Sequence, residues 1–214
     1  MFDSTNHLVI DLETFGLGPR AMVRSIALAE FNPWSDDEPK VTRYTLLPDE
    51  QAGRDIDPRT VLWWMRQPER ARRAFTDEHN PRNMWDLAED LLKKNGAIVW
   101  TKPLHCDVPI LLDLLRSYMP GIERLDGLLY RRRVHNARTI YEAASLLGDR
   151  IDEDPAAWGY AAEELHDPSV DATLTALTVR RALRILRGAS TSTGTRRPPR
   201  ELFVDDDERL VDRV

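Results

Sequence analysis

Residues 7–14, His-Leu-Val-Ile-Asp-Leu-Glu-Thr, combine an apolar run with two acids. Residues 8–10 are all apolar and two are β-branched, which is typical of a buried β-strand. Because side chains alternate between the two faces of a strand, Asp11 and Glu13 point to the same face. Neighbouring carboxylates repel each other, and burial adds to that cost. A divalent cation would relieve the repulsion, and oxygen ligands favour Mg²⁺ or Mn²⁺ over zinc. The alternative is a strand that ends at the surface, with both acids solvated.

The composition predicts one globular domain, residues 1–187, followed by a flexible tail, residues 188–214, which is rich in Ser, Thr, Gly, Arg and Pro at its start. The 214 residues are 42% hydrophobic and 31% charged, with a net charge of −6 and a pI of about 5.4, so the average charge gives no sign of nucleic-acid binding. The single cysteine, Cys106, excludes an internal disulfide and a cysteine-based zinc site. No apolar run reaches the roughly 20 residues of a membrane span, and the N-terminus has no signal-like segment. We therefore expect an intracellular, cytoplasmic protein that does not engage a membrane.

Local patterns predict an alternation of strands and helices. The first three strands, joined by short polar links, predict an antiparallel meander. Asp-Pro pairs at residues 57–58 and 167–168 are typical of an N-cap followed by proline at the first helical position. We expect strands at residues 7–14, 23–31, 41–47, 97–100 and 134–137, and helices at residues 58–67, 69–75, 81–94, from 107, 139–147 and 167–187.

The helix expected at residues 58–67 contains two adjacent tryptophans. At 100° per residue, Val61, Leu62, Trp64 and Met65 share one side, which predicts a buried face, and Trp63 lies opposite. A large aromatic side chain on the polar face is either a partly covered surface residue or a platform on which a base stacks.

Two further acids and a histidine lie where helices are expected to begin. Asp107 opens a helix after the strand at residues 97–100, and Asp171 lies in the first turn of the last helix. The partial positive charge of a helix N-terminus favours ionised acids there. His166 lies just before that last helix, where it could swing over a cation held by Asp171 and accept a proton from water. The alternatives are ordinary first-turn acids and a loop histidine without a catalytic role.

The order of these motifs resembles the DEDD family of 3′-5′ exonucleases, in its histidine-containing subgroup (DEDDh). The motifs are Asp-x-Glu on an early strand, Asp at a central helix and His-x4-Asp at a late helix. The resemblance is closest to the branch of mycobacterial exoribonuclease-like domains and tailed-phage exodeoxyribonucleases, and it spans about residues 7–187. Shared segments are Ser25-Ile26, the Thr-Val-x-Trp-Trp helix at residues 60–64, residues 99–102 before Asp107, and Arg138-Thr139. Two positions depart from the family pattern, because Cys106 replaces an aromatic residue and Pro168 replaces an alanine.

The resemblance implies an RNase H-like α/β fold, with a central mixed sheet of three antiparallel strands and then parallel strands, and helices on both faces. It implies a 3′-5′ exonuclease that releases nucleoside 5′-monophosphates from the 3′ end of single-stranded DNA or RNA. Two divalent cations, Mg²⁺ or Mn²⁺, would lie about 3.5–4 Å apart. The implied metal ligands are Asp11, Glu13, Asp107 and Asp171, with His166 as the fifth catalytic residue. The implied substrate-binding residues are Thr14, Trp63, Lys102 and Arg138.

Other interpretations stay open at this stage. A catalytically silent nucleic-acid-binding protein could have the same fold. The pair His166-Asp167 is also the dipeptide of HD-type phosphohydrolases, whose metal site is all-helical. The sequence does not fix the oligomeric state, and a homodimer is one of the states we consider. A phage-encoded protein falls within the expected intracellular location.

Overall fold

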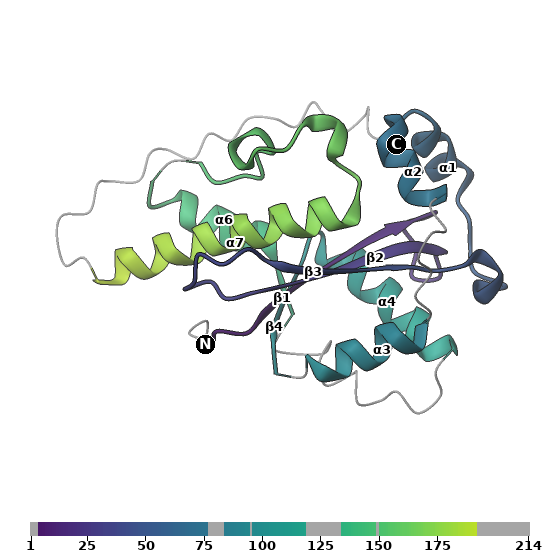
Figure 1. The fold of residues 1–214 in the computed structure, drawn as a ribbon, viewed down its shortest axis with the longest axis horizontal. Helices are drawn as coiled ribbons and strands as arrows, with labels where there is room; N and C mark the ends of the chain where they lie inside the picture. The colour runs from purple at the N-terminus through teal and green to yellow at the C-terminus, as the bar shows by residue number, and fades with distance from the viewer. Residues whose placement is uncertain (1–3, 77–83, 95, 119–133, 149, 192–214) are drawn as a thin grey trace.

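The computed structural model describes residues 4–76, 84–94, 96–118, 134–148 and 150–191, and these form a mixed five-stranded sheet with helices on both faces (Figure 1). The strand order is β3-β2-β1-β4-β5, with β1 and β2 antiparallel, β2 and β3 antiparallel, and β1, β4 and β5 parallel. The strands are β1 His7–Thr14, β2 Val23–Phe31, β3 Lys40–Thr45, β4 Ile98–Thr101 and β5 Val134–Asn136. The predicted meander and mixed sheet are therefore confirmed.

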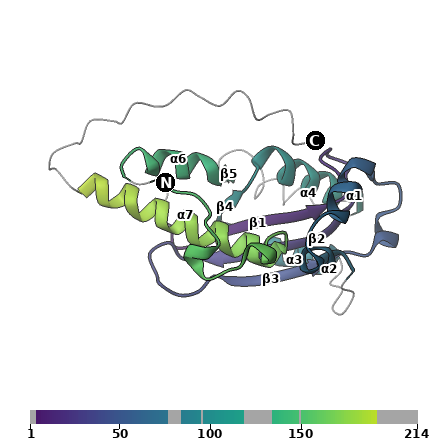
Figure 2. The ribbon, with the colours of Figure 1, turned by 90° about the horizontal axis from the view of Figure 1, so that it is seen from above.

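The alternation of side chains along β1 separates two hydrophobic cores. Leu8, Ile10 and Leu12 face α3 (Met84–Lys93) and α4 (Leu104–Tyr118). Val9 belongs to the core on the other face, together with α6 (Ala137–Ser145) and α7 (Pro168–Thr191), and Figure 2 shows α6 and α7 along that side. Asp11 and Glu13 have the same parity as Val9, so their carboxylates face α7.

Small residues bring α7 close to the sheet. Ala172, Ala176 and Ala182 are fully buried on the helix face that contacts the sheet, and Ala27 and Ala29 of β2 belong to the same core. Pairs of alanines allow a helix and a strand to approach closely, because no long side chain separates their backbones. This close packing places the first turn of α7 beside the end of β1 that bears the two acids.

Helix α1 (Pro58–Met65) corrects one prediction. Asp57 caps the helix as expected, accepting a hydrogen bond from Arg59 N at 2.9 Å. Of the four side chains assigned to a buried face, only Trp64 is buried, while Leu62 and Met65 are 54% and 65% exposed. The reason is that α1 covers one end of the sheet (Figure 1) and not a broad face, so two turns of helix bury one large side chain.

Several element boundaries also differ from those expected. Helix α4 begins at Leu104 and not at Asp107, because the backbone N–H groups of Cys106 and Asp107 already bond to Pro103 O at 3.2 and 3.4 Å. Asp107 consequently lies one turn inside the helix. Helix α7 continues to Thr191, four residues beyond its predicted end, and the rest of the predicted tail lies outside the described residues.

The remaining elements are short. They are α2 (Glu69–Thr76) and the 3₁₀ turns Pro48–Gln51, Ala156–Trp158 and Ala162–Glu164. Among the described helices, none has the length and apolar character required to cross a bilayer. The five-stranded sheet also contradicts the HD-type interpretation, which requires an all-helical site.

Candidate active site

The acids of β1 occupy a part of the sheet with small neighbours. Asp11 lies opposite Ala27 of β2, and Glu13 lies opposite Ser25. These short side chains leave room for two carboxylates on the face toward α7. Glu13 is only 7% exposed. The two acids are therefore held within the fold and are not solvated at a strand end.

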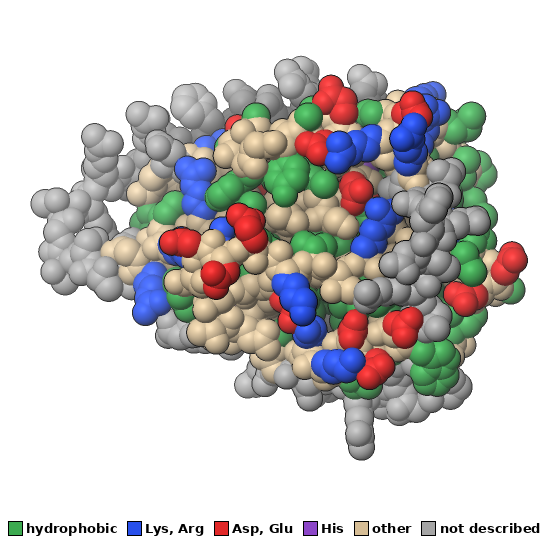
Figure 3. Space-filling model, in the orientation of Figure 1, with side chains coloured by type: hydrophobic (Ala, Val, Ile, Leu, Met, Phe, Trp, Pro, Cys, Tyr) green, Lys and Arg blue, Asp and Glu red, His purple; other side chains and the backbone are tan. Residues whose placement is uncertain are grey.

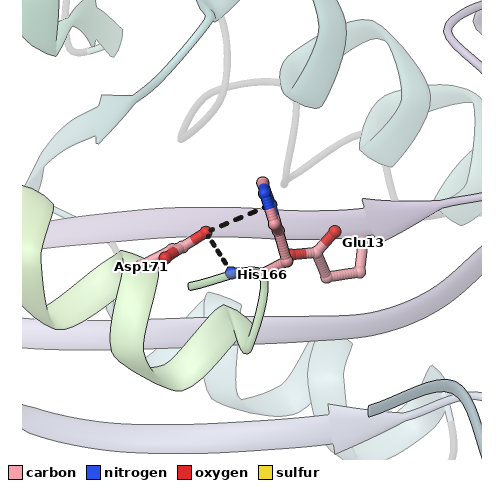
Figure 4. A group of neighbouring side chains, drawn as sticks. All are labelled: Glu13, His166 and Asp171. Carbon is pink, nitrogen blue, oxygen red and sulfur yellow. Dashed lines mark hydrogen bonds and ion pairs between the residues drawn. The ribbon is translucent and has the colours of Figure 1, made fainter. Parts of the chain in front are cut away.

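Glu13, His166 and Asp171 come together from β1 and the start of α7 (Figure 4). One ligand atom of each residue lies within 4.8 Å of the others. The backbone N–H of His166 donates to Asp171 Oδ2 at 3.1 Å, and His166 Nδ1 lies 4.0 Å from the same oxygen. This arrangement could hold a cation beside an imidazole.

The local backbone places His166 over α7. His166 has φ +66°, a left-handed conformation that is uncommon for residues other than glycine. Asp167 caps the helix by accepting from Ser169 N at 2.9 Å, and it forms an ion pair with Arg43 of β3 at 3.4 Å. Pro168 is the first residue of α7, so its replacement of the family alanine is compatible with the helix.

Asp107 completes a group of four acids that we name the carboxylate cluster: Asp11, Glu13, Asp107 and Asp171. Burial, and then repulsion from Asp171 and Asp107, raise the pKa of Asp11 well above its ordinary value. Burial, and then repulsion from Asp11, do the same to the pKa of Glu13. Burial raises the pKa of Asp107 to about 7 and is the main cause of the raised pKa of Asp171. Each acid therefore resists ionisation in the absence of a cation.

The cluster also contains polar atoms without partners. Asp11 Oδ2, Asp107 Oδ2 and Asp171 Oδ1 are buried and accept no hydrogen bond within the described structure. Buried polar atoms are nearly always satisfied, so three such oxygens in one place require an explanation. Carboxylate oxygens are the donors that Mg²⁺ and Mn²⁺ prefer. The donor set of the cluster therefore fits hard divalent cations.

Lys102 lies between the cluster and a second acid, Glu153. Its ammonium forms an ion pair with Glu153, which also accepts from Tyr141 Oη and Thr175 Oγ1, both at 2.8 Å. Burial lowers the pKa of Lys102, and the charges of Asp11 and Asp171 act against that shift. Glu153 thus fixes a lysine whose charge acts on the cluster. The sequence prediction missed Glu153, because an acid in an irregular loop carries no pattern that reveals its tertiary partner.

Trp63 contacts the candidate site directly. Its ring meets that of His166 edge-on, with centroids 4.9 Å apart, and its side chain is 41% exposed. The adjacent Trp64 is buried, and its Nε1 donates to Thr14 O at 3.0 Å. Trp63 is therefore partly covered and borders the candidate site. The buried position predicted for Trp64 is confirmed.

The other predicted substrate-binding residues lie around the same region. Thr14 ends β1, and its hydroxyl donates to Gly16 O at 2.6 Å. Arg138, on the first turn of α6, is exposed, and its charge contributes to lowering the pKa of Lys102. Cys106 is half-buried next to Asp107, and burial raises the pKa of its thiol. A protonated thiol offers a small apolar surface where the family has an aromatic ring.

Solved structures show the same fold. Exonuclease I from E. coli with a dA16 oligonucleotide has a TM-score of 0.57 and 15% identity, covering 88% of this chain and 43% of that chain. The RNase domain of yeast Pop2 has a TM-score of 0.56 and 13% identity, covering 86% of this chain and 78% of that chain. The chain therefore spans less than half the length of exonuclease I. At these identities the likeness establishes the fold.

The family follows from the sequence model that matches the chain. No curated protein matches it at a significant level. The model of the 3′-5′ exoribonuclease Rv2179c-like domain matches residues 6–182, which is most of the chain and includes all four acids of the cluster. This match confirms the resemblance found in the motifs. The chain belongs to the family of Rv2179c-like 3′-5′ exoribonuclease domains.

Proposed function

We propose that this protein is a 3′-5′ exonuclease, which hydrolyses single-stranded nucleic acid from its free 3′ end and releases nucleoside 5′-monophosphates with the help of two divalent cations. The observation that carries the proposal is the carboxylate cluster. Four acids from β1, α4 and α7 share one buried region, and three of their oxygens accept no hydrogen bond within the described residues. Such a group is costly for folding unless cations bind it.

Asp11 and Glu13, with Asp107 and Asp171, would hold the cations. When bound, the cations would supply positive charge that stabilises the attacking and the departing oxygens of an in-line displacement. Asp11 would be the central ligand of this group, because its pKa responds to the charges of both Asp171 and Asp107.

His166 is the base that fits the geometry. Its side chain is 37% exposed and lies beside Asp171, so it can reach a water molecule and also pass a proton to solvent. The water oxygen attacks the terminal phosphorus as the bond from phosphorus to the 3′ oxygen breaks. The proton of the water passes to His166, and the departing 3′ oxygen takes a proton from solvent. Asp171 would stabilise the protonated imidazole.

The preference for a single strand is supported by the structural relatives. E. coli exonuclease I was solved with dA16 and with dT13 oligonucleotides, and the family that includes this chain is described as exoribonucleases. These descriptions support a single strand as the substrate of this chain. The exposed ring of Trp63 beside His166 is suited to stacking an unpaired base.

A nuclease assay tests the proposal. Matched DNA and RNA oligonucleotides with a 5′ label, each with a free or a phosphorylated 3′ end, are incubated with the protein and Mg²⁺ or Mn²⁺, with and without EDTA. We expect a ladder of products shortened from the 3′ end, only with metal and only with a free end. Binding without hydrolysis under all conditions would favour the catalytically silent alternative. Cleavage that persists in EDTA would contradict the metal requirement.

A further inference from the structure

Helix α1 presents a stripe of cations and an aromatic ring to solvent. Arg59, Trp63 and Arg66 are spaced i, i+4 and i+7, so they lie along one face of the helix. All three are exposed, because the helix is anchored through Trp64 on its opposite side. Residues 58–66 contain no acid. Figure 3 shows basic, acidic and apolar side chains at this end of the molecule.

The two arginines of the stripe differ from several other exposed arginines of the protein, which form ion pairs with acids. Within the described residues, neither Arg59 nor Arg66 has an acidic partner. By contrast, Arg73 pairs with Glu69, Arg184 with Asp36, and the nearby Arg70 with Glu164 at 2.7 Å. In a chain with a net charge of −6, unpaired cations on one acid-free helix favour an anionic partner.

The stripe is continuous with the candidate active site. Trp63 contacts the ring of His166, and Trp64 donates to the backbone of Thr14 at the end of β1. The ion pair between Arg70 and Glu164 fixes α2 to the segment that leads into His166. The contacts of Trp63 and Trp64 thus join α1 directly to the site. An anionic chain whose end lies at His166 would meet Trp63 first and the arginines on either side of it.

We infer that the exposed face of α1 binds the single strand immediately upstream of its 3′ terminal nucleotide, with a base stacked on Trp63 and phosphates paired with Arg59 and Arg66. This inference rests on the proposed function and adds the path of the strand to it. Seven residues of helix separate the arginines by about 10 Å, the length of about three stacked nucleotides. Guanidinium groups suit phosphate because they donate two parallel hydrogen bonds.

The first test removes the charges of the stripe. The variants are Arg59→Ala, Arg66→Ala and both together, and the control is Arg181→Ala, an exposed arginine ten residues along α7 from Asp171. Binding of a fluorescent twelve-nucleotide strand is measured by anisotropy over a salt series, and kcat/KM is compared for the twelve-nucleotide strand and a dinucleotide. We expect each stripe variant to weaken binding about 3- to 10-fold and to reduce the salt slope by about 0.7 for each phosphate that the protein no longer neutralises. The preference for the longer substrate falls in the same variants, and Arg181→Ala behaves as the wild type.

The second test examines the ring. Trp63→Ala is expected to weaken strand binding about tenfold, and Trp63→Phe to restore most of the loss, because phenylalanine still offers a face for stacking. The melting temperature of each variant is measured in parallel, so that a folding defect is recognised. If the wild type degrades strands but the stripe variants match Arg181→Ala in affinity and salt slope, the inference is wrong. If neither the wild type nor any variant releases nucleotides, the proposed function is wrong. The binding measurements then still show whether the strand lies along α1.

Discussion

The carboxylate cluster and the acidic loop at residues 36–38 contain the same kinds of side chain, but only the loop surrounds its acids with arginines. Arg184 forms an ion pair with Asp36 at 2.7 Å and donates to the carbonyls of Pro33 and Ser35 at 2.7 Å each. Arg180 donates to Asp37 O at 2.7 Å. The hydrogen bond from Arg184 lowers the pKa of Asp36. The loop is thus fixed to α7 by two arginines, whose guanidinium groups bond to oxygen atoms of the loop.

In the carboxylate cluster, by contrast, the acids are not balanced by nearby cations among the described residues. Burial and mutual repulsion raise the pKa of all four acids, and Lys102, whose charge acts on them, is already paired with Glu153. An apolar group in the same space would favour folding more, because an unpaired buried charge is strongly destabilising. The difference indicates that the acids of the loop are compatible with a stable fold, whereas the acids of the cluster lower the stability of the fold unless cations bind them.

The largest effect is expected from Asp11→Asn, which keeps the shape of the side chain but removes its charge. Several kcal/mol of transition-state stabilisation would be lost with this cation ligand, so activity falls at least about a thousandfold. In EDTA at pH 8 the variant should be about 1–3 kcal/mol more stable than the wild type, because one repulsive buried charge is gone. Activity is followed by release of labelled nucleotide, and stability by urea unfolding.

A matched change in the loop, Asp36→Asn, controls for the substitution itself and should leave nuclease activity at the wild-type level. Retained metal-dependent turnover in Asp11→Asn would contradict the assignment of the cluster. A loss of stability in Asp11→Asn would contradict the view that the cluster opposes folding without metal.

A smaller effect is expected from pH. The folded protein raises the pKa of Asp107 from 3.8 to about 7, so the folded state holds a proton that the unfolded state has lost between these values. Stability in EDTA therefore falls as pH rises from about 4 to about 7, by about 2–4 kcal/mol for this group. The folded protein lowers the pKa of Asp36, so the contribution of Asp36 to stability rises with pH, in a lower pH range. The quantity to measure is the difference in unfolding free energy between the wild type and Asp107→Asn across this range.

Saturating Mg²⁺ should abolish that difference in slope, because bound cations stabilise the ionised cluster. A wild type that gains stability relative to Asp107→Asn as pH rises in EDTA would show that Asp107 is paired in the folded state. That result would remove the contrast between the cluster and the loop.

The sequence predicted the parts of the site that depend on local periodicity. Alternation along β1 placed Asp11 and Glu13 on one face, and the Asp-Pro cap placed Asp171 in the first turn of α7. The proximity of Asp107 to the acids of β1 was predicted only through the family resemblance, because no local feature of the sequence around Asp107 indicates that α4 begins beside β1. The meander and the parallel strands followed from link lengths and from the same resemblance.

The missed features depend on tertiary contacts. Periodicity grouped Leu62, Trp64 and Met65 on one side of α1, but it did not show that only Trp64 of these is buried. The pairing of Glu153 with Lys102 joins a loop to the end of β4, and no local signal encodes it. The backbone of His166 is left-handed, and its N–H donates to Asp171 in the first turn of α7; no local sequence pattern indicates this conformation.

The smallest effect is expected from Asp36→Ala. Asp36 is almost fully exposed, with 93% of its side-chain area accessible, so its attraction to Arg184 is screened by water and salt. Arg184 would keep its bonds to the carbonyls of Pro33 and Ser35, and these fix the loop to α7 without the carboxylate. We therefore expect no measurable change in melting temperature or in nuclease activity. Arg184→Ala is the informative partner, because it removes the carbonyl bonds as well and should lower the melting temperature. A large loss in Asp36→Ala would mean that the exposed acid, and not the backbone carbonyls, holds the loop, and the contrast with the cluster would need a different physical basis.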